Sequence, residues 1–324
     1  MVAMDSGPLG GLVIGKQDAT GRRKIELGGI AGAGARVRSG MMARPNPARS
    51  DRSLALFGIP GFGILGIMSN TTRAFDTVAR DYDATRGGER RGTAYAAALF
   101  PHVPPGLTLE VGVGTGVVAL GLERLGRDVV GVDVSLPMLA VARARTAGSL
   151  VAADGSLLPF ADESFDCVCA VWVLHAVSDP SAMLGEIQRV LRPSGHCLVC
   201  PTNHPAPDDV VGLELDRMFQ RVEGARPDPA PWTGFSVTAE RVLTWAEELG
   251  MTAEIQQLEE QSWDTTADRE IASIRDKVWS AMKTLEEETY VSITTDAIRF
   301  LESLPPGTIR RRAIAEMVIV QKQA

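Results

Sequence analysis

The stretch Leu109-Glu-Val-Gly-Val-Gly-Thr-Gly116 decides how this 324-residue chain folds. The apolar run 107–111 is typical of a strand, and the run 117–125 is typical of a helix ended by Gly126. Glycines in such a turn let the backbone pass close to a ligand and aim free N–H groups at it. The stretch therefore predicts a strand–turn–helix unit that binds a nucleotide-like cofactor.

Strand and helix patterns continue to alternate after this unit. Six further strands are predicted, at 129–132, 150–152, 165–173, 196–200, 252–258 and 313–320. Ser135 caps the helix after the second strand, and Asp179 with Pro180 opens the helix after the fourth. Short connections between alternating strands and helices favour right-handed crossovers with helices on both faces. We therefore predict an α/β fold, a doubly wound seven-stranded mostly parallel sheet.

The first 67 residues differ from the rest of the chain. They hold 14 of the 33 glycines and show neither helical nor strand periodicity. We predict that 1–67 is a disordered leader, or an extension upstream of a natural start at Met68. One domain is predicted at 68–324, with a cofactor-binding core at 105–200 and substrate-cover segments at 201–235 and 266–305.

Two details of the late chain complete the predicted plan. One stripe of a helix is predicted from apolar residues at helical spacing: Ile271, Ile274, Val278, Met282 and Leu285. A second helix is expected near 296–301. The run Arg310-Arg-Arg312 precedes the predicted last strand and is most simply a solvated turn.

Charge and composition argue against several classes of protein. The net charge is −7, divided as +5 on 1–67 and −12 on the remainder. A broad grip on nucleic acid or an anionic membrane needs a dense basic surface, so neither partner is predicted. The longest apolar stretch, 54–68, is broken by glycines and a proline and is too short to span a bilayer. Four cysteines form no secreted-domain framework, which predicts a reduced, cytoplasmic location.

The residues around the glycine turn discriminate between nucleotide cofactors. Asp133 ends the second strand, where a carboxylate accepts hydrogen bonds from ribose hydroxyls. A dinucleotide turn needs a glycine at the position of Val117, so the fit to a pyrophosphate is impaired. Glu110 places a negative charge beside the turn, which suits an ammonium and a sulfonium better than a diphosphate. Together these residues favour S-adenosyl-L-methionine (SAM) over NAD.

With these motifs in view, Glu110-Val-Gly-Val-Gly-Thr-Gly116 resembles the first motif of the class I SAM-dependent methyltransferases. Val130-Gly-Val-Asp-Val-Ser135 resembles their second motif, and Ala153-Asp154-Gly155 their adenine-side motif. Leu158-Pro-Phe-Ala-Asp-Glu-Ser-Phe-Asp166 is similar to their lead into strand four. The match covers about 73–200, implies a Rossmann-like methyltransferase fold, and is closest to small-molecule methyltransferases related to quinone-biosynthesis enzymes.

That resemblance implies a set of residues that bind SAM. Gly112 and Gly114, with Gly116, would approach the methionine part, and Asp133, next to Val134, would hold the ribose. Asp154, next to Gly155, would accept from the adenine amino group, and Met138 would pack on the adenine ring. Tyr82 would close over the cofactor, Arg86 would meet its carboxylate, and the Val171 carbonyl would lie near its ammonium. Each has a simpler structural interpretation, such as a turn former for Asp154 or core packing for Met138.

Methyl transfer needs alignment and exclusion of water more than it needs a base. His175, just after the fourth strand, is the one well-placed candidate for a general base, and its alternative is a wall of the site. Residues 167 and 169 share a strand face, whereas 197 and 200 point to opposite faces. The cysteines therefore predict buried thiols rather than a metal site.

The acceptor is expected over the carboxyl ends of the strands, beneath the cover segments. Apolar cover residues suggest a small-molecule methyl acceptor that is partly apolar: Trp232, Phe235, Trp263, Trp279 and Met282. The leading hypothesis is a SAM-dependent methyltransferase acting on oxygen or carbon. Two alternatives stay open at this point, a non-catalytic SAM-binding protein and an NAD-linked oxidoreductase.

Overall fold

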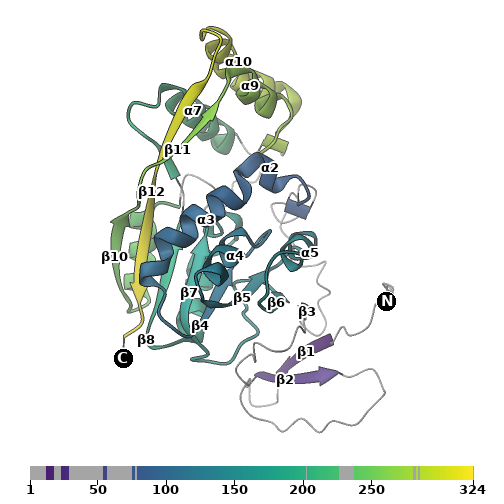
Figure 1. Ribbon diagram of the computed structural model, residues 1–324, viewed down its shortest axis with the longest axis vertical. Helices are drawn as coiled ribbons and strands as arrows, with labels where there is room; N and C mark the ends of the chain where they lie inside the picture. Colours follow the sequence, from purple (N-terminus) through teal and green to yellow (C-terminus); the bar gives the residue numbers. More distant parts are fainter. Residues whose placement is uncertain are drawn as a thin grey trace.

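The computed structural model describes residues 12–17, 23–28, 54–56, 75–76, 79–201, 203–225, 237–279, 282–283 and 285–323. Its main sheet runs in the order β10-β12-β8-β7-β4-β5-β6-β3 (Figure 1). The strands are β3 Leu54–Leu56, β4 Leu107–Val111, β5 Asp128–Asp133, β6 Leu150–Ala152, β7 Phe165–Val171, β8 Leu191–Cys200, β10 Thr252–Gln257 and β12 Ile309–Gln321. All seven predicted strands are among them.

The central strands of the sheet are parallel. β4 pairs with β5 and β7, β5 with β6, and β7 with β8, all in the parallel sense. β12 is antiparallel to both β8 and β10. Because the carboxyl ends of parallel strands lie at one edge, the loops after β4, β5, β6 and β7 meet there. The doubly wound, mostly parallel sheet predicted from the sequence is confirmed.

Helices pack on both faces of this sheet. On one face lie α3 Gly88–Leu99, α4 Val117–Arg124 and α5 Leu136–Arg143, whose buried residues share one apolar core with the sheet. On the other face, α6 Pro180–Val190 and α8 Ala239–Glu248 share a second core. Ser135 and Asp179 cap α5 and α6 as predicted, because their side chains accept backbone N–H groups of the first turn. No helix among the described residues is long and apolar enough to cross a membrane.

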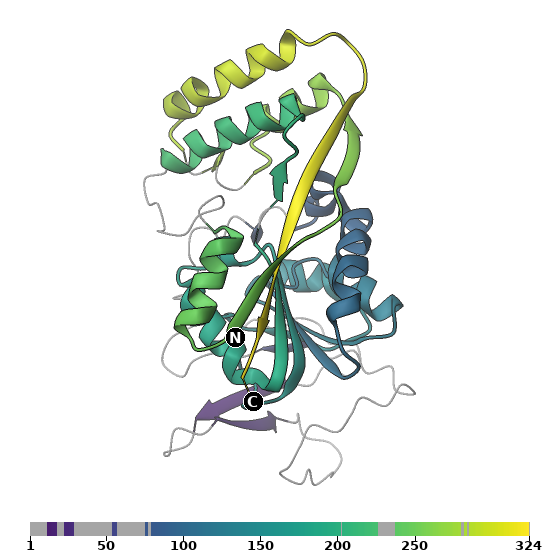
Figure 2. The ribbon, with the colours of Figure 1, turned by 90° about the vertical axis from the view of Figure 1, so that its left-hand side faces the viewer.

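A helical cover stands beyond the carboxyl edge of the sheet. It consists of β9 Asn203–Pro205, α7 Val210–Gly224, β11 Gln261–Thr265, α9 Ala267–Arg275 and α10 Glu287–Glu302. These helices bury a third apolar core of their own. The long strand β12 joins the two parts, because its first half pairs with β9 and β11 and its second half with β8 and β10 (Figure 2).

The structure corrects two predictions for the late chain. The apolar stripe from Ile271 to Leu285 is not one helix, because α9 ends at Arg275 and Lys277 has a positive φ of 48°. The run Arg310-Arg-Arg312 is not a solvated turn but part of β12. Arg311 is buried there, and two carboxylates neutralise its charge: Asp209 at 2.8 Å and Glu270 at 3.3 Å.

Three strands are described within the predicted leader. β1 Leu12–Gln17 and β2 Arg23–Gly28 form an antiparallel pair. β3 adds a parallel edge of three residues to β6. These strands were not expected in a leader without periodicity. The rest of 1–67 lies outside the described residues, so the leader stays a prediction.

Candidate active site

A cleft opens where the carboxyl ends of β4, β5, β6 and β7 meet. It encloses about 930 Å³, counted out to its open mouth. Residues of the four loops and of the preceding helices line it: Phe75, Tyr82, Val111, Gly112, Gly114, Val132, Asp133, Val134, Ser135, Met138, Ala153, Asp154, Gly155, Ser156, Trp172, Val173, Ala176, Val177, Ser178 and Met183. A concave, mostly apolar cleft with a few carboxylates is the usual form of a small-molecule site.

The glycine turn forms the floor of this cleft. Gly112 and Gly114 have φ angles of +74° and +54°, which only glycine adopts without strain. A Cβ on Gly112 would lie 2.3 Å from Val173, whereas a Cβ on Gly114 would meet nothing closer than 3.9 Å. Gly112 is therefore required by packing, and the backbone at Gly114 leaves open space in which a ligand fits.

Asp133 ties the glycine turn to the turn after β5. One carboxylate oxygen accepts the Gly114 N–H at 2.8 Å, and the other accepts the Ser135 N–H at 2.8 Å. Burial raises the pKa of Asp133, and these two backbone donors oppose the rise. Each oxygen keeps a lone pair for a further donor, so the side chain fits two adjacent hydroxyl groups.

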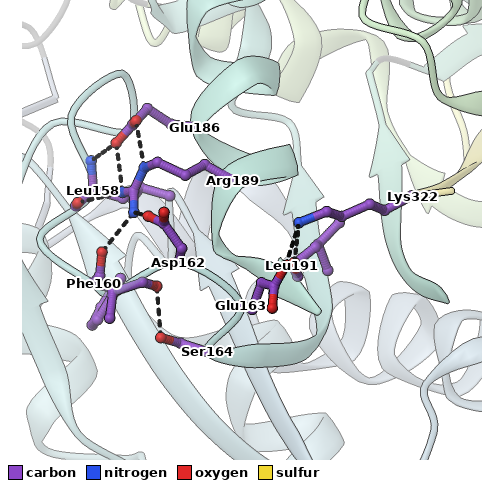
Figure 3. Close-up of polar contacts among 10 residues, drawn as sticks. Leu158, Phe160, Asp162, Glu163, Ser164, Glu186, Arg189, Leu191 and Lys322 are labelled. Carbon is purple, nitrogen blue, oxygen red and sulfur yellow. Dashed lines mark hydrogen bonds and ion pairs between the residues drawn. The ribbon is translucent and has the colours of Figure 1, made fainter. Parts of the chain in front are cut away.

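The loop after β6 presents Asp154 to the cleft and is held from below. Asp154 accepts the Ser156 N–H at 2.8 Å, which fixes a tight turn. Figure 3 shows Arg189 of α6 beneath the same loop, donating to the carbonyls of Leu158 at 2.9 Å and Phe160 at 2.8 Å. Glu186 pairs with Arg189 at 2.8 Å and accepts the Leu158 N–H. These contacts make Arg189 and Glu186 positioning residues for the loop.

The helix α2 Tyr82–Arg86 closes one side of the cleft. Asp83 accepts from the Thr115 hydroxyl at 2.6 Å and pairs with Arg145 at 2.7 Å. Arg145 also donates to the Thr115 carbonyl at 2.9 Å. This network anchors α2 to the glycine turn, and it holds Tyr82 at the cleft wall with the ring of Phe75 at its edge.

The cleft brings together most of the residues that the sequence predicted. Eight of them line it: Tyr82, Gly112, Gly114, Asp133, Val134, Met138, Asp154 and Gly155. Five do not: Arg86, Glu110, Gly116, Val171 and His175. Gly116 instead begins α4, and a Cβ there would lie 2.8 Å from Thr146. Val171 is a buried residue at the end of β7.

Glu110 lies behind the glycine turn rather than beside the cleft. Its side chain is 2% exposed, it accepts the Ala119 N–H, and its Oε2 has no partner among the described residues. Burial raises the pKa of Glu110 well above its ordinary value, and the nearby Asp133 raises it further. Glu110 is not among the residues that line the cleft, so the predicted contact between a Glu110 charge and a cationic cofactor has no geometric support.

A second group of side chains adjoins the cleft at Trp172. The guanidinium carbon of Arg91 lies 3.3 Å from the centre of the Trp172 ring, and Arg86 lies 5.8 Å from the Tyr82 ring. Half-buried His175 belongs to the same group. Burial lowers the pKa of His175 to about 4, and the positive charges of Arg86 and Arg91 lower it further. A neutral imidazole of such low basicity is a poor proton acceptor.

Sequence reasoning missed Trp172 and Ser135 as cleft residues. Trp172 lies at the end of the predicted strand 165–173, and Ser135 is the predicted cap of the helix after 129–132, so their position at the carboxyl edge was available from the pattern. Trp172 has a positive φ of 52°, a conformation that is rare for a bulky residue and that no sequence pattern predicts.

The other predicted site features have mixed outcomes. Cys167, Cys169, Cys197 and Cys200 are all buried free thiols. No cluster of three potential metal ligands occurs in the described part of the chain. In the cover, Met282 is buried and Trp279 packs edge-to-face on Phe219, with ring centroids 4.8 Å apart. Trp232 and Phe235 lie outside the described residues.

Known proteins resemble this chain over the same region. A family model described as a methyltransferase domain matches residues 109–199. The demethylmenaquinone methyltransferase of Renibacterium salmoninarum is 37% identical over 137 residues, 40% of this chain and 58% of that enzyme. The enzyme of that name from Mycobacterium sp. (strain KMS) is 34% identical over 194 residues, 56% of this chain and 81% of the relative. Among solved structures, phosphoethanolamine N-methyltransferase 2 of Haemonchus contortus in complex with SAM has a TM-score of 0.48 and 18% identity, covering 80% of this chain and 61% of that one.

Proposed function

Because this chain belongs to the class I SAM-dependent methyltransferases, we propose that it methylates oxygen or carbon of a small, partly apolar metabolite. The observation that carries the proposal is Asp133, which lies beside the glycine turn in one cleft with Asp154. The named substrate of the relatives, demethylmenaquinone, supports an apolar acceptor. The aromatic side chains of Trp172 at the cleft and Trp279 in the cover agree with it.

We infer how the cleft residues hold the cofactor from their positions in it. The glycine turn, with open space at Gly114, would receive the methionine part, and Asp133 the ribose hydroxyls. Asp154 and Met138 would hold the adenine, because both line the far part of the cleft beyond β5. Tyr82 would close the wall that α2 forms. SAM supplies a methyl group already activated by its sulfonium.

The residues outside the cleft lining would act from its edge. Arg86 would meet the cofactor carboxylate, since its guanidinium lies against Tyr82. The Val171 carbonyl, at the end of β7, would face the ammonium. Gly116 would shape the turn and start α4.

The acceptor would need alignment and a dry site rather than a strong base. His175 is a weak base, because its pKa is lowered to about 4. We therefore propose no base role for His175, which lies outside the cleft lining. The cover and α2 would exclude water, which strengthens every electrostatic contact inside.

Incubation of the protein with labelled SAM and a cell extract tests this function. We expect one labelled small molecule, together with S-adenosylhomocysteine. SAM binding without any labelled product would contradict the proposed reaction.

Calorimetric titration tests the assignment of Asp133. Asp133→Ala should weaken SAM binding by at least about tenfold, because buried hydrogen bonds to a charged acceptor are lost. Asp128→Ala is the matched control, since Asp128 begins the same strand at its exposed far end. Unchanged affinity in Asp133→Ala would remove Asp133 from the ribose site.

A further inference from the structure

Two guanidinium groups lie together beside the candidate active site. Arg86 ends α2, and Arg91 lies in the first turns of α3. In Figure 1, α2 lies near the base of the cover, and α3 runs from there along one face of the sheet. Arg86 lies 5.8 Å from the Tyr82 ring and 5.6 Å from the ring of Trp279, a cover residue.

Arg91 is the more enclosed of the two by aromatic rings. Its guanidinium carbon is 3.3 Å from the Trp172 ring centre and 6.0 Å from that of Tyr95. Hydrogen bonds hold Trp172 in this place. Its backbone N–H donates to the Cys200 carbonyl, and its indole N–H donates to the Asn203 side chain, which also accepts from the Tyr95 hydroxyl. A stacked, planar guanidinium keeps its N–H edge available for a planar anion.

Neither arginine has a carboxylate partner in the part of the chain that the structure describes. Other half-buried or buried arginines do have one, such as Arg145 with Asp83 and Arg311 with Asp209. The Arg91 guanidinium donates a long hydrogen bond of 3.4 Å to the Arg86 carbonyl and also hydrogen-bonds the Tyr95 side chain, and neither partner is a carboxylate. Burial is the first cause that lowers the pKa of each arginine, and Arg91 lowers that of Arg86 further.

Two neighbouring half-buried cations without an anion are costly, because charge removed from water needs a partner. The cofactor carboxylate satisfies one of them, Arg86, in the proposed function. Arg91 still lacks an anion, and SAM carries no second carboxylate. His175 adds no negative charge to the group.

Resting on the proposed function, we propose that the methyl acceptor binds as an oxyanion on a planar frame, with its charge against the Arg91 guanidinium and its frame beside Trp172. Such an acceptor loses its proton to solvent before transfer, because the nearby guanidinium favours the anion, so the site needs no strong base. The reacting oxygen or carbon then bonds to the methyl carbon of SAM as the bond from that carbon to sulfur breaks, and S-adenosylhomocysteine leaves. The oxyanion is either the reacting oxygen of a phenolate or enolate, or a carboxylate on the same frame.

Paired probes test this proposal by calorimetry in the presence of S-adenosylhomocysteine. The enolate pair is 2-hydroxy-1,4-naphthoquinone and its neutral 2-methoxy ether, and the carboxylate pair is 2-naphthoate and 2-naphthamide. At least one anion should bind the wild-type protein about tenfold or more tightly than its neutral counterpart. The pair that shows the preference identifies the kind of oxyanion.

Variants of one helix then assign the preference to its source. Arg91→Gln should abolish the preference for the anion, and Arg91→Lys should keep part of it, because the charge stays while the planar stacking is lost. Arg90→Gln is the matched control, since exposed Arg90 reaches only the Ser262 carbonyl among the described residues and should keep the full preference.

The outcomes separate this inference from the proposed function. Equal binding of anions and neutral probes, no binding of either anion, or a preference that survives Arg91→Gln would overturn the role of Arg91. S-adenosylhomocysteine affinity should be unchanged in Arg91→Gln, which shows that the variant is folded. Failure of the wild-type protein to bind SAM or to label any metabolite would instead contradict the proposed function.

Discussion

Glu110 is a buried carboxyl whose ionisation should weaken the fold. Its pKa is raised well above the ordinary value of 4.5, first by burial and then by Asp133 and Glu123. The stabilising effect of a raised pKa is fully present below the unfolded-state pKa and is lost as the pH rises through the folded-state pKa. The loss amounts to about 1.4 kcal/mol for each pH unit between the two pKa values.

We therefore predict that Glu110→Gln removes this pH dependence. The free energy of unfolding of the wild-type protein should fall relative to the variant as the pH rises above 4.5, the ordinary pKa of this carboxyl. Urea denaturation of both proteins across that range measures the difference. Glutamine keeps an acceptor for the Ala119 N–H, so the comparison isolates the charge. Parallel stability profiles would show that Glu110 is ionised in the folded protein.

Glu110 is also a residue whose position the sequence did not predict. Successive side chains of a strand point to opposite faces, and Val111 lines the cleft, so Glu110 must point away from it. The alternation was available from the sequence, but the position of Val111 in the cleft was known only from the structure. The group around Arg91 was not available, because the contact of Arg91 with Trp172 joins two segments that share no local pattern.

At the scale of elements, the first turns of the cover depend on one buried ion cluster. Asp209 caps α7 by accepting the Gly212 N–H at 2.7 Å, and it also pairs with Arg311 of β12 at 2.8 Å. Glu270 of α9 pairs with the same arginine at 3.3 Å. The cluster therefore joins α7, α9 and β12 through side chains that are at most 12% exposed.

Arg311→Met should destabilise the protein by about 3–5 kcal/mol, because two carboxylates would stay buried without a cation. Arg310→Met is the matched control on the same strand. Arg310 pairs with Asp264, but both side chains are more than half exposed, so its loss should cost less than about 1 kcal/mol. Chemical denaturation measures both values. Equal effects would mean that the buried cluster contributes no more than the exposed pair.

Sequence patterns predicted the strands of the core, including 313–320 of β12, and failed at the first residues of β12 for a physical reason. The seven core strands carry apolar periodicity that local sequence reveals. Three consecutive arginines instead suggested a solvated turn. The residues that neutralise Arg311, Asp209 and Glu270, lie 102 and 41 positions away, and only the folded chain brings them together.

At the scale of the whole molecule, the sheet and the cover share one strand while the N-terminal part stands at the sheet margin. The continuous β12 pairs with β8 and β10 in the core and with β9 and β11 in the cover. Among the described residues, none before Phe75 lines the cofactor cleft.

We predict that a chain beginning at Met68 keeps its fold and its affinity for SAM. Within the described part of 1–67, the contact with the core sheet is the three-residue edge strand β3 on β6, and β1 and β2 pair with each other. Thermal denaturation should give a single transition with a midpoint within a few degrees of the full chain, because an edge strand of this length buries little area. Calorimetry should give a SAM affinity within about twofold, since the glycine turn, Asp133 and Asp154 are untouched. A large loss of affinity in a folded truncated chain would place a residue of 1–67 at the cofactor.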